Sequence, residues 1–211
     1  MLDWILGLDK EAFLFLNSKN SPMWDQIMWW ISAKITWIPL YVVLLVVLIR
    51  NDLSFRVIIT LLFIAVTVVL CDQISVLLKN MIERLRPSHV AEFKEIIHLV
   101  INPKTGVKYT GGQYGFVSSH AANVFGVATI IASQLKNFKW GLFLFSWAII
   151  VSYSRIYLGV HYPLDIICGA LLGTLIGIHL YVLKTWTMSY IDIKLKERQA
   201  KKRRQEKLQK S

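Results

Sequence analysis

Long apolar runs alternate with short polar segments along most of the chain. A helix needs about 20 predominantly apolar residues to cross the hydrocarbon core of a bilayer. The pattern therefore predicts about five transmembrane helices and an all-α fold, a polytopic membrane helix bundle. The approximate ranges of the five helices are 27–49, 56–78, 116–135, 138–158 and 162–183.

The first residues follow a different pattern. Residues 2–16 mix Leu, Ile, Trp and Phe with Asp9, Lys10 and Glu11. This segment is too charged to span and predicts an amphipathic helix in the membrane interface, although a sixth span within residues 2–21 stays open. The N-terminus lacks a basic region and a small-residue cleavage site, so no cleavable signal peptide is expected.

The expected organisation has three parts. An N-terminal interfacial amphipathic helix occupies residues 1–23, a membrane domain residues 24–183, and a basic cytoplasmic tail residues 184–211. Composition agrees, because a chain of 211 residues that is 55% hydrophobic has more apolar surface than a soluble domain of that size can bury. Cys71 and Cys168 fall in apolar stretches, which argues against a disulfide framework or a zinc site.

Positive charge is concentrated in the tail. Residues 184–211 hold ten Lys or Arg and three Asp or Glu, so they contribute 10 − 3 = +7 of the net charge of +11. Next to a membrane helix, such a tail indicates contact with anionic membrane lipids rather than nucleic acid. The positive-inside rule predicts a cytoplasmic tail, and five spans then put the N-terminus and the long loop 79–115 outside. That loop is also basic, which calls for a functional reason.

This topology brings several chemically active residues to one face of the membrane. Charged residues that converge at the ends of membrane helices usually mark a functional site. The residues concerned are Lys79 at the end of the second helix, Ser118 and His120 at the start of the third, Arg155 near the end of the fourth, and His161 and Asp165 at the start of the fifth.

Three segments carry a resemblance to a known family. Lys79–Pro87 reads K-x6-R-P, Val117–His120 reads V-S-S-H, and Ser154–Asp165 reads S-R-x5-H-x3-D. In this order and spacing they resemble the signature of the type 2 phosphatidic acid phosphatase (PAP2) superfamily. That superfamily includes lipid phosphate phosphatases, undecaprenyl diphosphate phosphatases, lipid A phosphatases and vanadium haloperoxidases. The resemblance covers roughly residues 24–183.

The second segment departs from the family pattern. Val117 stands where the family has Pro, and Ser119 stands where it has Gly. A backbone N–H donor at Ser119 survives this change, while the added hydroxyl either narrows the pocket or adds a donor. The departure therefore concerns the fit of the substrate more than the type of reaction.

The resemblance implies a metal-independent phosphatase without a cofactor. It implies a His161 nucleophile oriented by Asp165, with His120 as general acid. A phosphoryl group in transfer spreads negative charge over three oxygens and needs fixed donors. The residues expected to bind the substrate phosphate are Lys79, Arg86, Ser118, Ser119 and Arg155.

Each residue also has a plainer interpretation. Basic residues at positions such as Lys79 and Arg86 are, taken alone, more often interfacial anchors. A histidine at a helix start, such as His120, is more often a cap or a packed ring. It is their joint occurrence that favours a site. Lys34 is expected to snorkel outward or to pair with an acid. The glycines at 169, 173 and 177 predict close helix packing.

The sequence thus predicts an integral membrane lipid phosphatase that acts through a phosphohistidine. Undecaprenyl diphosphate, a lipid A phosphate, and phosphatidate or phosphatidylglycerol phosphate all stay open as substrates, and the oligomeric state is not predicted. The expected location is a bacterial inner membrane, with the active site on the outer, periplasmic side. One alternative is a non-catalytic lipid- or anion-binding protein or transporter on the same fold, against which the intact His120, His161 and Asp165 argue. Vanadium haloperoxidases are larger and soluble, so five spans argue against that class.

Overall fold

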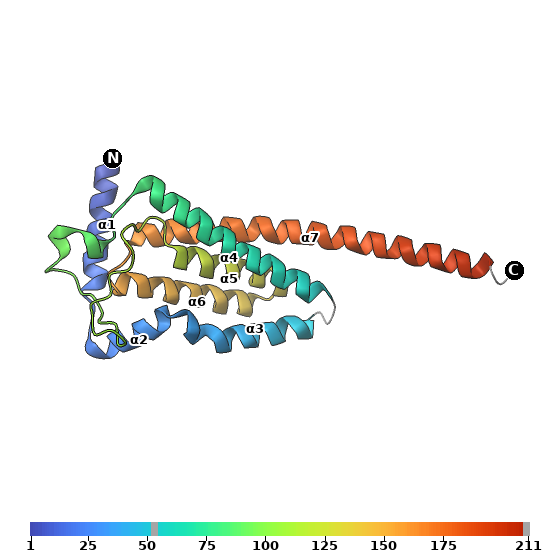
Figure 1. Cartoon of the computed structure of the whole chain (residues 1–211), viewed down its shortest axis with the longest axis horizontal. Coiled ribbons are helices and arrows are strands. Elements are labelled where there is room, and N and C mark those ends of the chain that lie inside the picture. The colour runs from blue at the N-terminus through green and yellow to red at the C-terminus, as the bar shows by residue number, and fades with distance from the viewer. Residues whose placement is uncertain (52–54, 209–211) are drawn as a thin grey trace.

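The computed structural model describes residues 1–51 and 55–208, and within these ranges the chain is helical and has no strands. Figure 1 shows α3 to α7 running side by side as an elongated bundle, with α1 across one end and α7 extending far beyond the other. The elements are α1 (Leu2–Asn17), α2 (Pro22–Ser32), η1 (Lys34–Trp37), α3 (Ile38–Asn51), α4 (Phe55–Ile82), η2 (Pro87–His89), η3 (Ala91–Phe93), α5 (Ser119–Leu135), α6 (Phe138–Tyr157) and α7 (Pro163–Leu208).

Three segments of the described chain are long and apolar enough to cross a bilayer. They are Lys34–Asn51, Phe55–Ile82 and Pro163–Arg203. The expected all-helical membrane fold is therefore confirmed. Helices α5 and α6, with 17 and 20 residues, pack against each other inside the bundle. The count of about five spans stays a prediction.

The first predicted span is wrong in detail, because residues 27–49 do not form one helix. Helix α2 ends at Ser32, and α3 begins only after one extended residue and the short helix η1. Pro39 has no backbone N–H, so it fits only the first turn of a new helix. The indole N–H of Trp37 donates to the Ile31 carbonyl at 2.8 Å, which satisfies a carbonyl left open where α2 ends.

Helix α5 lies at the centre of the bundle, in contact with α4, α6 and α7. A Cβ added at Gly173 of α7 would lie 2.0 Å from the Ala122 carbonyl oxygen, and one at Gly169 would lie 2.6 Å from that of Ser118. The expected packing role of these glycines is confirmed. The close approach also joins the two helix starts, where the Ser118 N–H donates to the Asp165 carbonyl at 3.0 Å.

Helix α1 and the long α4–α5 loop close the end of the bundle. The buried Asn17 side chain accepts from the His98 backbone N–H at 2.8 Å and donates to the carbonyls of His98 and Tyr157 at 3.1 and 3.0 Å. Phe13, fully buried, stacks on Phe93 of the loop. These contacts fasten α1 to the loop and to the end of α6.

The basic tail continues α7 without a break. Residues 184–208 are helical, and Arg56 of α4 donates to both carboxylate oxygens of Asp192 at 2.9 Å. The expected boundary between residues 183 and 184 therefore coincides with no interruption of the helix, and the three-part organisation stays a prediction. Residues 209–211 lie outside the described part of the chain.

Candidate active site

His161 and Asp165 form a buried pair at the start of α7. The His161 Nδ1 atom lies 3.2 Å from Asp165 Oδ2, and the Tyr162 backbone N–H donates to the same oxygen at 3.0 Å. The two side chains are 2% and 0% exposed. The carboxylate thus fixes one ring nitrogen of His161, as the i, i+4 spacing predicts, and leaves the other for chemistry.

The surroundings of His161 favour the neutral ring. Burial lowers the pKa of His161 well below its ordinary value, and the positive charges of Arg86, Arg155 and Lys79 lower it further. A backbone hydrogen bond with Gly115 opposes this shift in part. The ring is therefore unprotonated at neutral pH, which is the form that a nucleophile requires.

Lys79 and the start of α5 meet on one side of the pair. Lys79, in the last turn of α4, donates from Nζ to Ser119 Oγ at 2.6 Å. The Ser118 side chain caps α5, with its Oγ accepting the Ala121 N–H at 3.4 Å. The hydroxyl proton of Ser118 stays available to donate, and a helix N-terminus favours an anion.

Arg86 is held by the backbone of the long loop. Its Nε donates to the Tyr114 carbonyl and its backbone N–H to the Gln113 carbonyl, both at 3.0 Å. Gly111 has φ +67, and a Cβ there would lie 2.4 Å from Arg86 Nη1. Only glycine combines this left-handed backbone with such a close approach, so the loop is shaped to hold the guanidinium.

Arg155 reaches the site from the last turn of α6 and is 3% exposed. Its Nη1 donates to Ser32 Oγ, and its Nη2 donates to the Tyr109 hydroxyl at 3.1 Å. Its Nε has no hydrogen-bond partner in the described part of the chain. No sequence motif points to Ser32 or Tyr109, because the first lies at an unpredicted helix break and the second in a loop without a motif.

The three expected phosphate-binding cations share one electrostatic property. Within residues 1–51 and 55–208, Lys79, Arg86 and Arg155 form no ion pair with a carboxylate. Burial, followed by the nearby charge of Arg155, lowers the pKa of Arg86. Like charges held together away from water are unfavourable until an anion joins them. Such an arrangement favours the binding of an anion.

Arg84 behaves differently, and its role was missed from the sequence. It donates from Nη1 to Asp165 Oδ1 at 2.9 Å and from Nη2 to Asp9 Oδ2 at 2.6 Å. Its guanidinium carbon lies 4.0 Å from the centre of the Tyr162 ring. Arg84 stands two residues before Arg86 in the first motif, but only the folded structure brings α1 to it.

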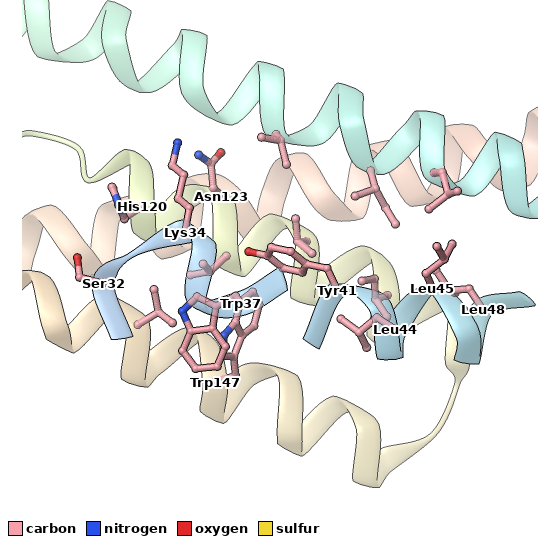
Figure 2. Close-up of a pocket in the computed structure, with 17 residues that line it drawn as sticks. Ser32, Lys34, Trp37, Tyr41, Leu44, Leu45, Leu48, His120, Asn123 and Trp147 are labelled. Carbon is pink, nitrogen blue, oxygen red and sulfur yellow. The ribbon is translucent and has the colours of Figure 1, made fainter. Parts of the chain in front are cut away.

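Two cavities meet beside His120. One, of about 590 Å³, opens among residues of the long loop, and the other, of about 360 Å³, runs along α3 into the bundle. They share Ser32, Lys34 and His120 in their walls. Figure 2 shows His120 and Lys34 at one end of the inner cavity and Leu48 at the other. Of the expected site residues, His120 lines both cavities and Arg155 lines the outer one, so this part of the site opens towards an apolar cavity.

Lys34, for which snorkelling or an ion pair was expected, forms no ion pair within the described ranges. Its side chain is exposed and lines both cavities. Figure 2 shows it projecting to the same end of the inner cavity as Asn123. The helix break explains this placement. The backbone changes direction after α2 ends at Ser32, so Lys34 does not continue the path of that helix.

The described part of the chain contains no group of three or more His, Cys, Asp or Glu side chains placed to hold a metal ion. The expectation that hydrolysis proceeds without a metal stays a prediction, to be tested by chelation.

Comparison with known proteins gives a consistent result. The model of the PAP2 superfamily matches residues 56–189. A lipid A 4'-phosphatase of Bacteroides thetaiotaomicron is 33% identical over 174 residues, which cover 82% of this chain and 75% of the relative. A lipid A 4'-phosphatase of Porphyromonas gingivalis is 31% identical, and the match covers 88% of this chain and 78% of the relative. An undecaprenyl-diphosphatase of Sulfolobus acidocaldarius is 28% identical, with 82% and 76% covered.

Two crystal structures are similar to this fold. Aquifex aeolicus LpxE is 26% identical with a TM-score of 0.60, and the match covers 82% of this chain and 94% of that one. The PAP2 type phosphatidylglycerolphosphate phosphatase from Bacillus subtilis is 22% identical with a TM-score of 0.61, and the match covers 89% and 87%. At that identity, the second similarity concerns the fold alone.

Proposed function

The chain belongs to the PAP2 superfamily and is a membrane-embedded phosphatase, and from that premise we propose that it hydrolyses a lipid phosphate through a phosphohistidine at His161. One observation carries the proposal. Lys79, Arg86 and Arg155, three cations without a carboxylate partner in the described chain, lie close to the His161–Asp165 pair, and His120 beside them lines a cavity that leads into the apolar bundle.

In the first step, the unprotonated nitrogen of His161 attacks phosphorus. A P–N bond forms while the bond from phosphorus to the lipid oxygen breaks. His120 donates a proton to that oxygen, so the lipid leaves as an alcohol or, from a diphosphate, as a monophosphate. Lys79, Arg86 and Arg155 stabilise the charge on the equatorial oxygens, together with the Ser118 hydroxyl and the Ser119 N–H.

In the second step, water attacks the phosphohistidine. His120, now unprotonated, accepts a proton from the water, and the P–N bond breaks. Inorganic phosphate leaves and His161 returns to its starting form. Asp165 keeps the ring in one tautomer through both steps. The cations supply the charge neutralisation that a metal ion supplies in other phosphatases.

The substrate that fits this site is a lipid with its phosphate at the end. The phosphate would occupy the space beside Arg155 and His120, and a hydrocarbon chain the cavity of about 360 Å³ lined by Trp37, Leu44 and Leu48. Lipid A phosphates and undecaprenyl diphosphate, the substrates in the names of the relatives, are the first candidates. We place the enzyme in a bacterial inner membrane with its site on the periplasmic side, because the +7 tail favours the cytoplasm.

Phosphate release from purified protein in detergent tests the proposal. The panel holds a lipid A phosphate, undecaprenyl diphosphate, phosphatidate and phosphatidylglycerol phosphate, each with EDTA. We expect release from at least one lipid in EDTA, and loss of release by more than 10²-fold in His161→Gln. His179→Gln is the matched control, since His179 is exposed on the same helix, and it should retain full activity.

Two results would contradict the proposal. Equal activity of wild type and His161→Gln would rule out His161 as the nucleophile. Activity that is lost in EDTA and returns only with added magnesium or zinc would rule out charge neutralisation by the protein's own cations. Binding of lipid phosphate without release from any lipid would favour the alternative, a lipid- or anion-binding protein.

A further inference from the structure

Asp9 is a buried carboxylate on α1, outside every motif of the active site. Its residue is 4% exposed, and both of its oxygens are occupied. Oδ2 accepts from Arg84 Nη2 at 2.6 Å, and Oδ1 accepts from the Leu164 backbone N–H at 2.8 Å. A buried charge is costly unless it is paired in this way. Its position therefore requires an explanation beyond an interfacial helix.

The contacts of Asp9 continue into the catalytic pair. Arg84 uses its second nitrogen, Nη1, to bind Asp165 Oδ1 at 2.9 Å, while the other oxygen of Asp165 faces His161 Nδ1 at 3.2 Å. A guanidinium is planar and holds its donors at fixed angles. Fixing Arg84 on one side therefore fixes the Asp165 carboxylate, and with it the His161 ring, on the other.

Asp9 also holds the helix that carries Asp165. Leu164 lies in the first turn of α7, where the backbone N–H groups have no partner within the helix. A carboxylate that accepts one of them acts as a cap and complements the positive end of the helix dipole. Asp9 thus supports Asp165 by two routes, through Arg84 and through the backbone of α7.

We propose that Asp9 is a positioning residue of the phosphatase and that α1 completes the active site by holding Arg84 against Asp165. The inference rests on the proposed function, since it assigns a role in the step that His161 performs. Asp9 and Asp165 both form ion pairs with Arg84, so its charge is compensated within the protein. In this respect Arg84 differs from the cations proposed to bind phosphate.

Removing the Asp9 carboxylate releases the side chain of Arg84 and one N–H of α7. The Asp165 carboxylate then loses its fixed neighbour, and the His161 ring loses its orientation. Small errors in the attack geometry lower the rate of a positioned reaction by about 10²-fold. Binding should change little, because Lys79, Arg86 and Arg155 make none of their hydrogen bonds to Asp9. The effect therefore falls on kcat and leaves KM nearly constant.

The variants Asp9→Ala and Asp9→Asn test this split with the lipid that wild type hydrolyses best. Both should lower kcat by about 10²-fold and leave KM within about threefold. The amide of Asp9→Asn puts a donor against the donors of Arg84, or gives up the Leu164 bond if it turns. Asp9→Glu keeps the charge and should recover at least a tenth of wild-type kcat. Glu11→Gln, an exposed acid on the same helix, should match wild type.

The variant Asn17→Ala distinguishes positioning by Asp9 from a purely structural role of α1. Asn17 is buried and fastens the C-terminal end of α1 through hydrogen bonds to the backbone of His98 and Tyr157, and it makes no hydrogen bond to Arg84. We expect Asn17→Ala to lower the melting temperature while kcat stays within about threefold below that temperature. A kcat loss in Asp9→Asn that merely follows the loss of melting temperature seen for Asn17→Ala would overturn the proposal, as would unchanged kcat.

Histidine nitrogen NMR gives a readout that needs no substrate. In wild type and Glu11→Gln, His161 should show one tautomer with a slowly exchanging Nδ1 proton, and in Asp9→Asn that proton should exchange fast. An unaltered His161 signal in Asp9→Asn would refute the positioning role. If wild type releases phosphate from no lipid, the proposed function fails, and this spectrum still decides whether Asp9 orients His161.

Discussion

Lys79 Nζ donates a 2.6 Å hydrogen bond to Ser119 Oγ, at the position where the family motif has glycine. The hydroxyl that departs from the pattern thus fixes Lys79, one of the cations proposed to bind phosphate, and links the end of α4 to the start of α5. The departure has a physical role: it replaces the freedom of a long lysine chain with one orientation.

The first prediction concerns this contact. Ser119→Ala should lower kcat/KM by about tenfold, because a hydrogen bond to a charged group contributes about 1.5–3 kcal/mol and water replaces part of it. Ser119→Thr keeps the hydroxyl and should stay within about threefold of wild type. Steady-state phosphate release checks both variants, and an Ser119→Ala enzyme as active as wild type would show that Lys79 needs no such support.

Lys34 provides the second prediction. It stands where the outer cavity meets the apolar one, so it should attract the anionic end of a lipid whose chain lies in the bundle. Lys34→Gln should raise KM by about fivefold, equivalent to roughly 1 kcal/mol, and change kcat little. Lys19→Gln, an exposed lysine near the end of α1, is the control. A fall in kcat at constant KM would instead place Lys34 in the chemical step.

The third prediction is a dependence of stability on pH. The folded protein holds the pKa of His161 well below its ordinary value, so the unfolded chain binds this proton more tightly. The contribution to stability is then complete above about pH 6.5 and is lost as the pH falls towards the folded pKa.

The melting temperature in detergent should therefore fall between pH 7 and pH 5 in wild type. In His161→Gln, which cannot titrate at this position, the fall should be smaller by at least about 2 °C, the change expected for roughly 1 kcal/mol in a chain of this size. Parallel curves for the two proteins would contradict a depressed pKa.

The sequence predicted which proposed catalytic residues lie close together better than it predicted the elements that support them. Lys79, His120, Arg155 and His161 were placed together because each lies at a helix end, and alternating spans bring such ends to one face. The pattern did not predict the break after Ser32, since apolar residues resume beyond Lys34 and the two stretches together have the length of one span.

The contact between Asp9 and Arg84 could not be predicted from the sequence either. The two residues are far apart in the sequence, and the hydrophobic pattern of α1 says only that one of its faces is apolar. The packing of α1 across the end of the bundle determines which acidic residue forms an ion pair with which arginine. Glycine spacing on α7, by contrast, predicted close packing correctly, because a missing Cβ acts locally.

The fourth prediction is the orientation in the membrane. Figure 1 shows the long loop and the C-terminal end of α7 at opposite ends of the bundle. In a protein with Cys71 and Cys168 replaced by Ser, a cysteine at Thr105 should react with an impermeant thiol reagent on spheroplasts, and one at Gln199 should not. The reverse labelling would put the active site in the cytoplasm.

The most direct test of the central claim is to trap the phosphoryl group on the enzyme. A lipid labelled with ³²P in its terminal phosphate is mixed with wild-type enzyme and quenched in alkali within milliseconds, and the labelled peptide is sequenced. A phosphohistidine nucleophile predicts label that is stable in alkali, is lost in acid, maps to His161 and is absent from His161→Gln. Rapid phosphate release with no label on the protein, or label on any other residue, would contradict the assignment of His161 as the nucleophile.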